Sequence, residues 1–269
     1  MRLAVVGHVE WVEFALVGAI PSCGEIVQAQ ETWQEAAGGG ADAVVQMAKL
    51  AGAATLFTAL GDDALGRRSA AELRARGVRI EVAWRREPQR RAMCFLDSDG
   101  ERTITLLGPK LVPRREDPLP WGELAETDGV YFSGGDPDAL RAARSARVLV
   151  ATARELPTLA DAGVELDVLI ASATDHGERH VDGDLDPPPR YVVRTEGNDG
   201  GTVEPGGRFL AVNPHGAIVD TYGAGDAFAG GLTYALAAGD DIDGALVFAA
   251  RCGAAVLTAR GPYDGQLVR

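Results

Sequence analysis

Residues 220–231 of this chain are Asp220-Thr221-Tyr222-Gly223-Ala224-Gly225-Asp226-Ala227-Phe228-Ala229-Gly230-Gly231, and they give the clearest indication of its fold and chemistry. Two glycines separated by one residue let the backbone approach a ligand closely and expose successive N–H groups. The pattern from Ala227 to Ala238 predicts a helix, so these N–H groups would lie at a helix N-terminus. Such a terminus binds anions, because its amides are unpaired and the helix dipole is positive there.

A carboxylate in the first turn of this helix would lie beside the bound anion, and Asp226 occupies that position. It can accept a proton from an attacking hydroxyl while neighbouring amides stabilise charge on a transferred phosphoryl group. The alternative is an ordinary Gly-rich turn with an aspartate at the start of a helix. The complete string is much more specific than an isolated Gly-x-Gly, and it favours phosphoryl transfer.

Around this stretch, short apolar runs alternate with amphipathic segments. Strands are expected at Leu3 to Val9, Ala54 to Leu60, Gly129 to Phe132, Arg147 to Ala151, Asp167 to Ile170 and Tyr191 to Arg194. Helices are expected at Asp42 to Leu50, Ala64 to Arg76 and around Pro137 to Ala146. This alternation predicts an α/β fold with a mainly parallel sheet that is covered on both faces.

Two segments interrupt the alternation. Arg91 to Leu96 and Thr103 to Leu107 flank Asp97-Ser98-Asp99-Gly100, and an Asp-Gly pair favours a hairpin turn. The segment from Trp11 to Gln30 also looks extended. We therefore expect one α/β domain over residues 1–269 with a small β lid, whose segments lie near residues 10–35 and 90–107.

Composition excludes several classes of protein. The net charge of −13 argues against a nucleic-acid partner, which requires basic surface. No apolar run approaches the roughly 20 residues that span a bilayer, and the N-terminus lacks the pattern of a signal peptide, so we expect a cytoplasmic protein without a membrane partner. Three dispersed cysteines and four histidines give no zinc-site spacing.

The 220–231 string resembles the C-terminal signature of the ribokinase-like, or PfkB, carbohydrate kinases. Three further segments are similar to elements of that family and occur in the family's order. They are Gly38-Gly39-Gly40-Ala41-Asp42, Ala59-Leu60-Gly61-Asp62-Asp63-Ala64-Leu65-Gly66 and Val193-Arg194-Thr195-Glu196-Gly197-Asn198-Asp199-Gly200. Together the matches extend over almost the whole chain.

This resemblance implies a ribokinase-like three-layer sandwich with a β lid, ATP as phosphoryl donor, and Mg²⁺ held mainly through phosphates and water. It implies that Asp226 is the catalytic base and that Gly223, Ala224 and Gly225 form the anion hole. The implied nucleotide contacts are Thr195, Gly197, Gly200 and Thr221, with adenine against residues 249–262, where Gly253 permits close approach. The implied substrate contacts are Gly38, Gly39, the residue at position 42, and Asp226. Lids of this family often pair between protomers, which implies a homodimer through the lid with Met93, Phe95, Ile104 and Leu106 as candidate contacts. The alternative is that these four residues cover the protomer's own site.

Three positions depart from the family pattern. Asp42 replaces an asparagine that contacts the sugar; it suits hydroxyls or an amine, or else it caps the helix. Ser172-Ala173-Thr174-Asp175 replaces an Asn-x-x-Glu element, so Asp175 is a weak candidate for Mg²⁺ through water, with His176 or Glu178 as possible substitutes. Glu10 and Glu13 are the candidates for a substrate-binding aspartate after the first strand, or else they are solvated lid residues.

These observations predict an ATP-dependent phosphotransferase that acts on a hydroxyl of a small sugar or sugar-like substrate. A nucleoside kinase is the first alternative. A catalytically weak regulator that binds a nucleotide or sugar is the second, favoured by the altered 172–175 element and opposed by the Asp226 constellation.

Overall fold

A large, mainly parallel sheet forms the centre of the protein, in a computed structural model that describes all residues from Met1 to Arg269. Its strands are β1 (Leu3–Val6), β4 (Ala54–Gly61), β5 (Val78–Arg85), β8 (Gly129–Phe132), β9 (Val148–Thr152), β10 (Val168–Ser172), β11 (Tyr191–Thr195), β12 (Gly201–Glu204) and β13 (Gly207–Phe209). The order across the sheet is β13-β12-β11-β10-β9-β8-β1-β4-β5, and only β12 and β13 run antiparallel to their neighbours. The predicted α/β class and mainly parallel sheet are confirmed.

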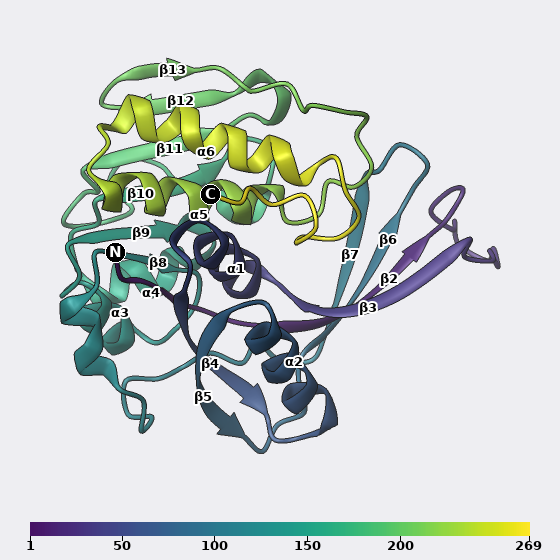
Figure 1. Cartoon of the computed structure of the whole chain (residues 1–269), viewed down its shortest axis with the longest axis horizontal. Helices are drawn as coiled ribbons and strands as arrows, with labels where there is room; N and C mark the ends of the chain where they lie inside the picture. Colours follow the sequence, from purple (N-terminus) through teal and green to yellow (C-terminus); the bar gives the residue numbers. More distant parts are fainter.

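Helices cover both faces of this sheet. One face carries α1 (Gly39–Ala51), α2 (Ala64–Ala75), α5 (Ala224–Ala238) and α6 (Ile242–Val256); the other carries α3 (Pro137–Ala143), α4 (Leu156–Ala162) and the short 3-10 helix η1 (Trp121–Glu126). The separation follows from the alternation of strand side chains: Leu3 and Val5 pack with α1 and α5, while Ala4 and Val6 pack with α3 and α4. Figure 1 shows α5 and α6 in front of β9 to β12, running roughly along these strands. Three further 3-10 helices are η2 (Ala153–Glu155), η3 (His176–Glu178) and η4 (Gly197–Asp199).

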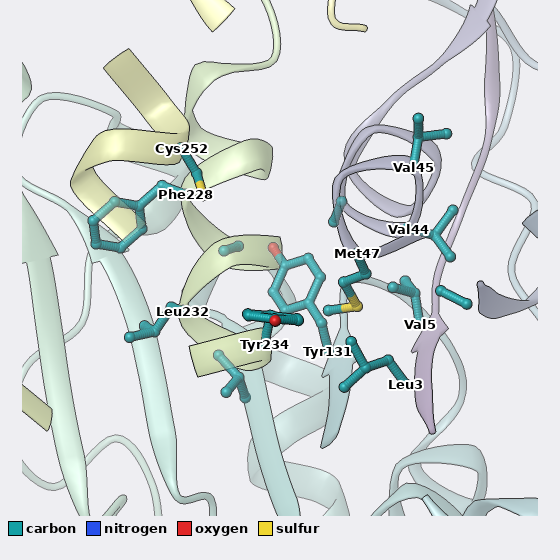
Figure 2. Close-up of a cluster of buried hydrophobic side chains, with 14 of the residues drawn as sticks. Leu3, Val5, Val44, Val45, Met47, Tyr131, Phe228, Leu232, Tyr234 and Cys252 are labelled. Carbon is teal, nitrogen blue, oxygen red and sulfur yellow. The ribbon is translucent and has the colours of Figure 1, made fainter. Parts of the chain in front are cut away.

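The core between α5, α1 and the sheet fixes the position of α5. Figure 2 shows Leu232 and Tyr234 of α5, Met47 of α1, and Tyr131 of β8 in this layer. Small residues let the helices approach, since a Cβ on Gly230 would lie 2.8 Å from the carbonyl oxygen of Ala43. The N-terminus of α5 is therefore held by close packing rather than by a flexible loop.

A second, smaller sheet projects from the body and is called the lid sheet below (Figure 1). Its strand order is β3 (Glu31–Ala37), β2 (Glu10–Leu16), β6 (Arg91–Leu96) and β7 (Arg102–Leu107). Strands β2 and β6 pair in parallel, whereas the outer strands pair antiparallel to them. Both β interruptions predicted from sequence thus belong to one sheet.

The two faces of the lid sheet differ. Val12, Phe14, Ala92, Cys94 and Leu96 form a buried apolar cluster. Met93 and Phe95 alternate with these residues and lie on the opposite face. Ile104 and Leu106 pair with Cys94 and Ala92, so they share the cluster's face instead of joining Met93 and Phe95.

Several predicted boundaries were wrong. The first strand ends at Val6, and the chain then passes into the lid sheet, where β2 begins at Glu10. The extended segment expected to reach Gln30 stops at Leu16, and β3 begins only at Glu31. The helix expected from Asp42 starts at Gly39, and the helix expected to reach Ala146 ends at Ala143. Strands β5, β12 and β13 were not predicted.

No helix of the chain combines the length and the apolar character needed to cross a membrane.

The packing of α5 gives a stability prediction. Leu232 is 0% exposed, whereas Val247 on α6 is 55% exposed. We expect Leu232→Ala to lower the free energy of unfolding by about 2–5 kcal/mol, because it leaves a cavity in the core. The control Val247→Ala should change it by less than about 0.5 kcal/mol. Urea denaturation measures both, and equal losses would contradict this description of the core.

Candidate active site

The first turn of α5 presents unpaired backbone amides. Gly223 precedes the helix with φ 79°, and no side chain caps this end. The first bond of the helix runs from the amide of Ala227 to the carbonyl of Gly223, so the amides of Ala224, Gly225 and Asp226 have no acceptor within the helix. Only glycine fits at position 223, because of its φ and because a Cβ would lie 2.7 Å from Cβ of Pro262.

Asp220 fixes the segment before this turn. Its Oδ1 accepts a bond from the amide of Tyr222 at 2.8 Å, and its Oδ2 accepts one from the amide of Gly261 at 2.9 Å. Burial raises the pKa of this carboxyl, although the two amides oppose the shift. The side chain therefore ties the turn to the C-terminal segment.

Asp226 faces the Gly-rich start of α1. A Cβ on Gly39 would stand 3.1 Å from Asp226 Oδ1, 3.4 Å from His8 Cε1 and 3.7 Å from Ser133 Cβ. Because Gly39 has no side chain, space remains between Asp226 of α5, His8 of the β1–β2 connection and Ser133 at the end of β8. The hydroxyl of Ser133 is buried and has no hydrogen-bond partner.

The pKa of Asp226 is raised to about 7. Burial is the main cause, and the negative charge of Glu178 adds to it, while Arg102 and Arg154 act in the opposite direction. A carboxyl with this pKa exchanges a proton near neutral pH, which is what a general base for a hydroxyl requires.

Asp42 lies fully buried beneath the same site. It is 0% exposed, and neither carboxyl oxygen has a hydrogen-bond partner. Burial and then the neighbouring Asp226 raise its pKa well above the usual value, which favours the protonated form of this carboxyl. The alternative interpretation as a helix cap was wrong, because Gly38 is the N-cap residue of α1 and Asp42 lies inside the first turn.

Glu10 and His8 form the lid side of the site. Glu10 is buried, and its Oε1 lies 3.0 Å from Nε of Arg90 and 3.8 Å from Nε2 of His8. Burial raises the pKa of Glu10, with Arg90 opposing it. Burial also lowers the pKa of His8, so the ring is neutral and its Nδ1 can donate to the carbonyl of Ser133 at 3.2 Å. Glu13 instead pairs with Arg91 and lies away from this group.

The 172–178 segment surrounds Arg154. Asp175 and Glu178 both form ion pairs with this guanidinium, and Asp175 also accepts a bond from the amide of Gly177 at 2.8 Å. Burial would raise the pKa of Asp175, but these partners lower it overall, whereas burial raises the pKa of Glu178. The negative charge of Glu178 also raises the pKa of Asp226, so Glu178 is the acidic residue of this segment that influences the candidate base.

The residues predicted to contact the nucleotide in the 193–200 segment lie at and after the end of β11. Thr195 ends β11, Gly197 opens η4, and Gly200 follows η4 with φ 82°. A small hollow nearby is lined by Asn213, Pro214 and His215 on one side and by Arg251, Ala254 and Ala255 of α6 on the other. Gly253 does not line this hollow: it faces α5, where a Cβ would lie 3.1 Å from the carbonyl oxygen of Ala224.

Thr221 contacts the lid sheet. Its amide and its hydroxyl both donate to the carbonyl of Gly100, at 3.1 and 3.0 Å. Arg102 donates to the carbonyl of Thr221 at 3.1 Å. Neither Arg102 nor the role of Asp220 was identified from sequence. Asp220 belongs to the 220–231 string and was open to recognition, but nothing in the sequence marks Arg102 among the other lid arginines.

Comparison with known proteins places this geometry in context. The family model described as pfkB family carbohydrate kinase matches residues 2–176 and 185–267. An ATP-dependent ribose-1-phosphate kinase of Halopiger xanaduensis is 28% identical, with 94% of this chain and 91% of that protein aligned. An acarbose 7(IV)-phosphotransferase of an Actinoplanes species is 36% identical over 85 residues, which cover 30% of this chain and 28% of that protein.

Solved structures show the same fold. Ribokinase from Giardia lamblia superposes with a TM-score of 0.80 at 17% identity, covering 100% of this chain and 96% of that one. Ribokinase from Thermotoga maritima gives a TM-score of 0.79 at 19% identity, covering 100% and 97%. The expected three-layer arrangement with a lid is confirmed by these neighbours.

The buried Asp42 predicts an unusual dependence of stability on pH. The folded protein retains this proton at pH values where the unfolded chain has lost it, so stability should fall as pH rises above the ordinary aspartate pKa of about 3.9. One such proton contributes a slope of about 1.4 kcal/mol per pH unit, and Asp226 adds a slope of the same sign up to its own pKa. Asp42→Asn removes the Asp42 contribution, so we expect a flatter profile and a more stable protein at neutral pH. Urea denaturation at several pH values tests this, and an unchanged slope would show that Asp42 is ionised.

Proposed function

Because the chain belongs to the pfkB family of carbohydrate kinases, we propose that it transfers the γ-phosphoryl group of ATP to a hydroxyl of a small sugar or sugar-like molecule. Asp226 acts as the general base. The observation that carries the proposal is its position in the first turn of α5, beside unpaired amides and with a pKa of about 7.

The chemistry requires little of the protein beyond positioning. The acceptor oxygen forms a bond to the γ-phosphorus, the bond from that phosphorus to the bridging oxygen breaks, and ADP leaves. Asp226 takes the hydroxyl proton, and the amides at Gly223, Ala224 and Gly225 stabilise the charge on the transferred group.

On the substrate side, the acceptor lies over Gly38 and Gly39, between Asp226 and the lid. Glu10 and the unpartnered hydroxyl of Ser133 are the polar groups that hydrogen-bond its other hydroxyls. Asp42 is fully covered by protein, so it acts from below the acceptor, as a buried neighbour of Asp226.

On the donor side, the nucleotide extends from the start of α5 toward β11 and α6. Thr195, Gly197, Gly200 and Thr221 follow its phosphates and ribose. The base occupies the hollow beside α6, and Gly253 contributes by letting α6 approach the first turn of α5.

Mg²⁺ is part of this proposal. No cluster of three or more metal-ligating side chains is present. Mg²⁺ is commonly held by one or two carboxylates together with substrate phosphates and water, so the donor set fits an ion bound chiefly by ATP. Asp175 and Glu178 are the residues that would hold it through water, and the ion would neutralise phosphate charge.

The acceptor is to be found by assay. Because one relative is named a ribose-1-phosphate kinase and another an acarbose phosphotransferase, ADP release should be screened with ribose, ribose 1-phosphate, other sugars and sugar phosphates, acarbose and nucleosides. A nucleoside as the only acceptor would support the nucleoside-kinase alternative. Nucleotide binding without turnover on any of them would support a regulator.

In this proposal the whole chain, residues 1–269, acts as one kinase domain whose lid sheet covers the acceptor. The lid also provides the surface for a homodimer. Its edge strand β7 is exposed along its whole length, and an exposed edge offers unpaired backbone groups to another chain.

Asp226→Asn tests the role of the base. The amide keeps the shape of the side chain but accepts no proton, so we expect kcat to fall by about 10²–10⁴-fold. Binding of ATP, measured by calorimetry, should be retained. Asp243→Asn is the matched control, because Asp243 lies in the first turn of α6 and is exposed. A loss of activity below about tenfold would refute the assignment.

The dimer is tested separately by sedimentation velocity over a range of concentrations. We expect a dimer that Ile104→Lys converts to a monomer, because a charge on the exposed β7 opposes edge pairing. A wild-type protein that stays monomeric throughout would reject the dimer.

A further inference from the structure

The tip of the β6–β7 hairpin is fastened to the segment that precedes the anion hole. The carbonyl of Gly100 accepts two hydrogen bonds from Thr221, one from its amide and one from its hydroxyl. Arg102 returns a bond to the carbonyl of Thr221 at 3.1 Å and reaches its hydroxyl oxygen at 3.2 Å. The carbonyl of Gly100 and the guanidinium of Arg102, both in this hairpin, therefore bind the same residue, Thr221.

The next residue makes an apolar contact with the same sheet. Tyr222 is buried in the cluster on the inner face of the lid sheet, with its ring edge-on to Phe14 at 5.0 Å between centroids. Phe14 in turn stacks on Trp33 at 4.8 Å. Thr221 and Tyr222 thus bind the lid, while Asp220 before them binds the body and Gly223 after them begins α5.

The backbone of the hairpin suits this contact. Gly100 adopts φ 78°, and a Cβ there would lie 3.0 Å from the carbonyl oxygen of Val219. Any other residue would be strained and would push the tip away from the turn. The turn residue expected from the Asp-Gly signal is therefore also a point of close approach between lid and body.

We propose that Arg102 is a positioning residue, which together with Gly100 latches the lid sheet to Thr221 and thereby holds the anion-hole turn and Asp226 in their working arrangement. This inference rests on the proposed role of Asp226. It assigns the lid a second task besides covering the acceptor: the donor side of the site is complete only while the lid is docked.

Electrostatics supports the same coupling. The charged and titratable groups around Asp226 are Glu10 and Arg102 from the lid sheet, His8 from the β1–β2 connection, Asp42 from α1, Tyr131 from β8, Arg154 from η2, Glu178 from η3 and Tyr222 from the turn before α5. Among them Arg102 is the strongest influence that lowers the pKa of Asp226. Replacing Arg102 by a neutral residue removes this positive charge, so Asp226 would keep its proton to higher pH and a smaller fraction of it would be ionised at pH 7.

The test compares Arg102→Gln with Arg102→Lys and with the control Arg91→Gln, which changes a lid arginine paired with Glu13 outside the site. The dependence of kcat/KM on pH is measured with the best acceptor from the screen. For Arg102→Gln we expect the acid limb to move up by about half to one pH unit, with about a tenfold lower kcat/KM at pH 7. Arg102→Lys should keep the limb near its wild-type position, and Arg91→Gln should match the wild type.

Hydrogen exchange gives a readout that does not depend on turnover. The amide of Thr221 should exchange faster in Arg102→Gln, and in Gly100→Ala, where backbone strain displaces the tip while leaving Arg102 in the chain. The Arg91→Gln control should leave that amide unchanged.

The outcomes separate the two proposals. The positioning role of Arg102 alone would be overturned if Arg102→Gln shifts neither the acid limb of kcat/KM nor the exchange of the Thr221 amide, while Asp226→Asn is inactive. Full activity of Asp226→Asn would overturn the proposed base. A shifted limb together with faster exchange would support the latch.

Discussion

One buried carboxylate holds together the parts of this protein that meet at the start of α5. Asp220 accepts bonds from the amides of Tyr222 and Gly261, so a single side chain fixes both the turn before the helix and the C-terminal segment beside it. Gly223 then enters the helix with a positive φ, and packing against α1 and the large sheet prevents α5 from moving. These contacts fix the positions of the unpaired amides and of Asp226. Their chemistry therefore depends on residues that never contact a substrate.

The site concentrates acidic groups in a region of low polarity. Asp42 and Asp226 are close enough to influence each other, and burial favours the neutral form of both. Most basic residues nearby are matched, since Arg90 pairs with Glu10, Lys110 with Glu155, and Arg154 with Asp175 and Glu178. Arg102 instead bonds to Thr221, and the net effect is a proton acceptor with a pKa near neutrality. A buried acid that is neutral costs less free energy than an ionised one, so the fold tolerates Asp42 where neighbouring polar atoms cannot solvate it.

Sequence reasoning recovered the parts of the fold that are encoded locally. Alternating apolar runs gave the parallel sheet, the Asp-Gly pair gave the β6–β7 hairpin, and the 220–231 string gave the turn and helix around Asp226. It missed β5 and also β12 and β13, which are short and form one edge of the sheet. It took residues 11–30 as one extended segment, because the loop after Leu16 carries no signal of where pairing stops and resumes. The roles of Arg102 and Asp220 depend on segments more than a hundred residues apart or brought together by the C-terminus, and no local pattern encodes such contacts.

The lid sheet is assembled from two separate stretches of chain. Its central pair joins β2 to β6 in parallel, with Trp11 opposite Arg91, and the intervening segment forms α1, β4, α2 and β5 of the body. The ends of this long connection come together only after the body has begun to form, since closing a large loop has an entropic cost that the lid strands alone cannot offset. The lid should consequently depend on β4 and β5 of the body, because these strands lie in the connection that brings its two stretches together.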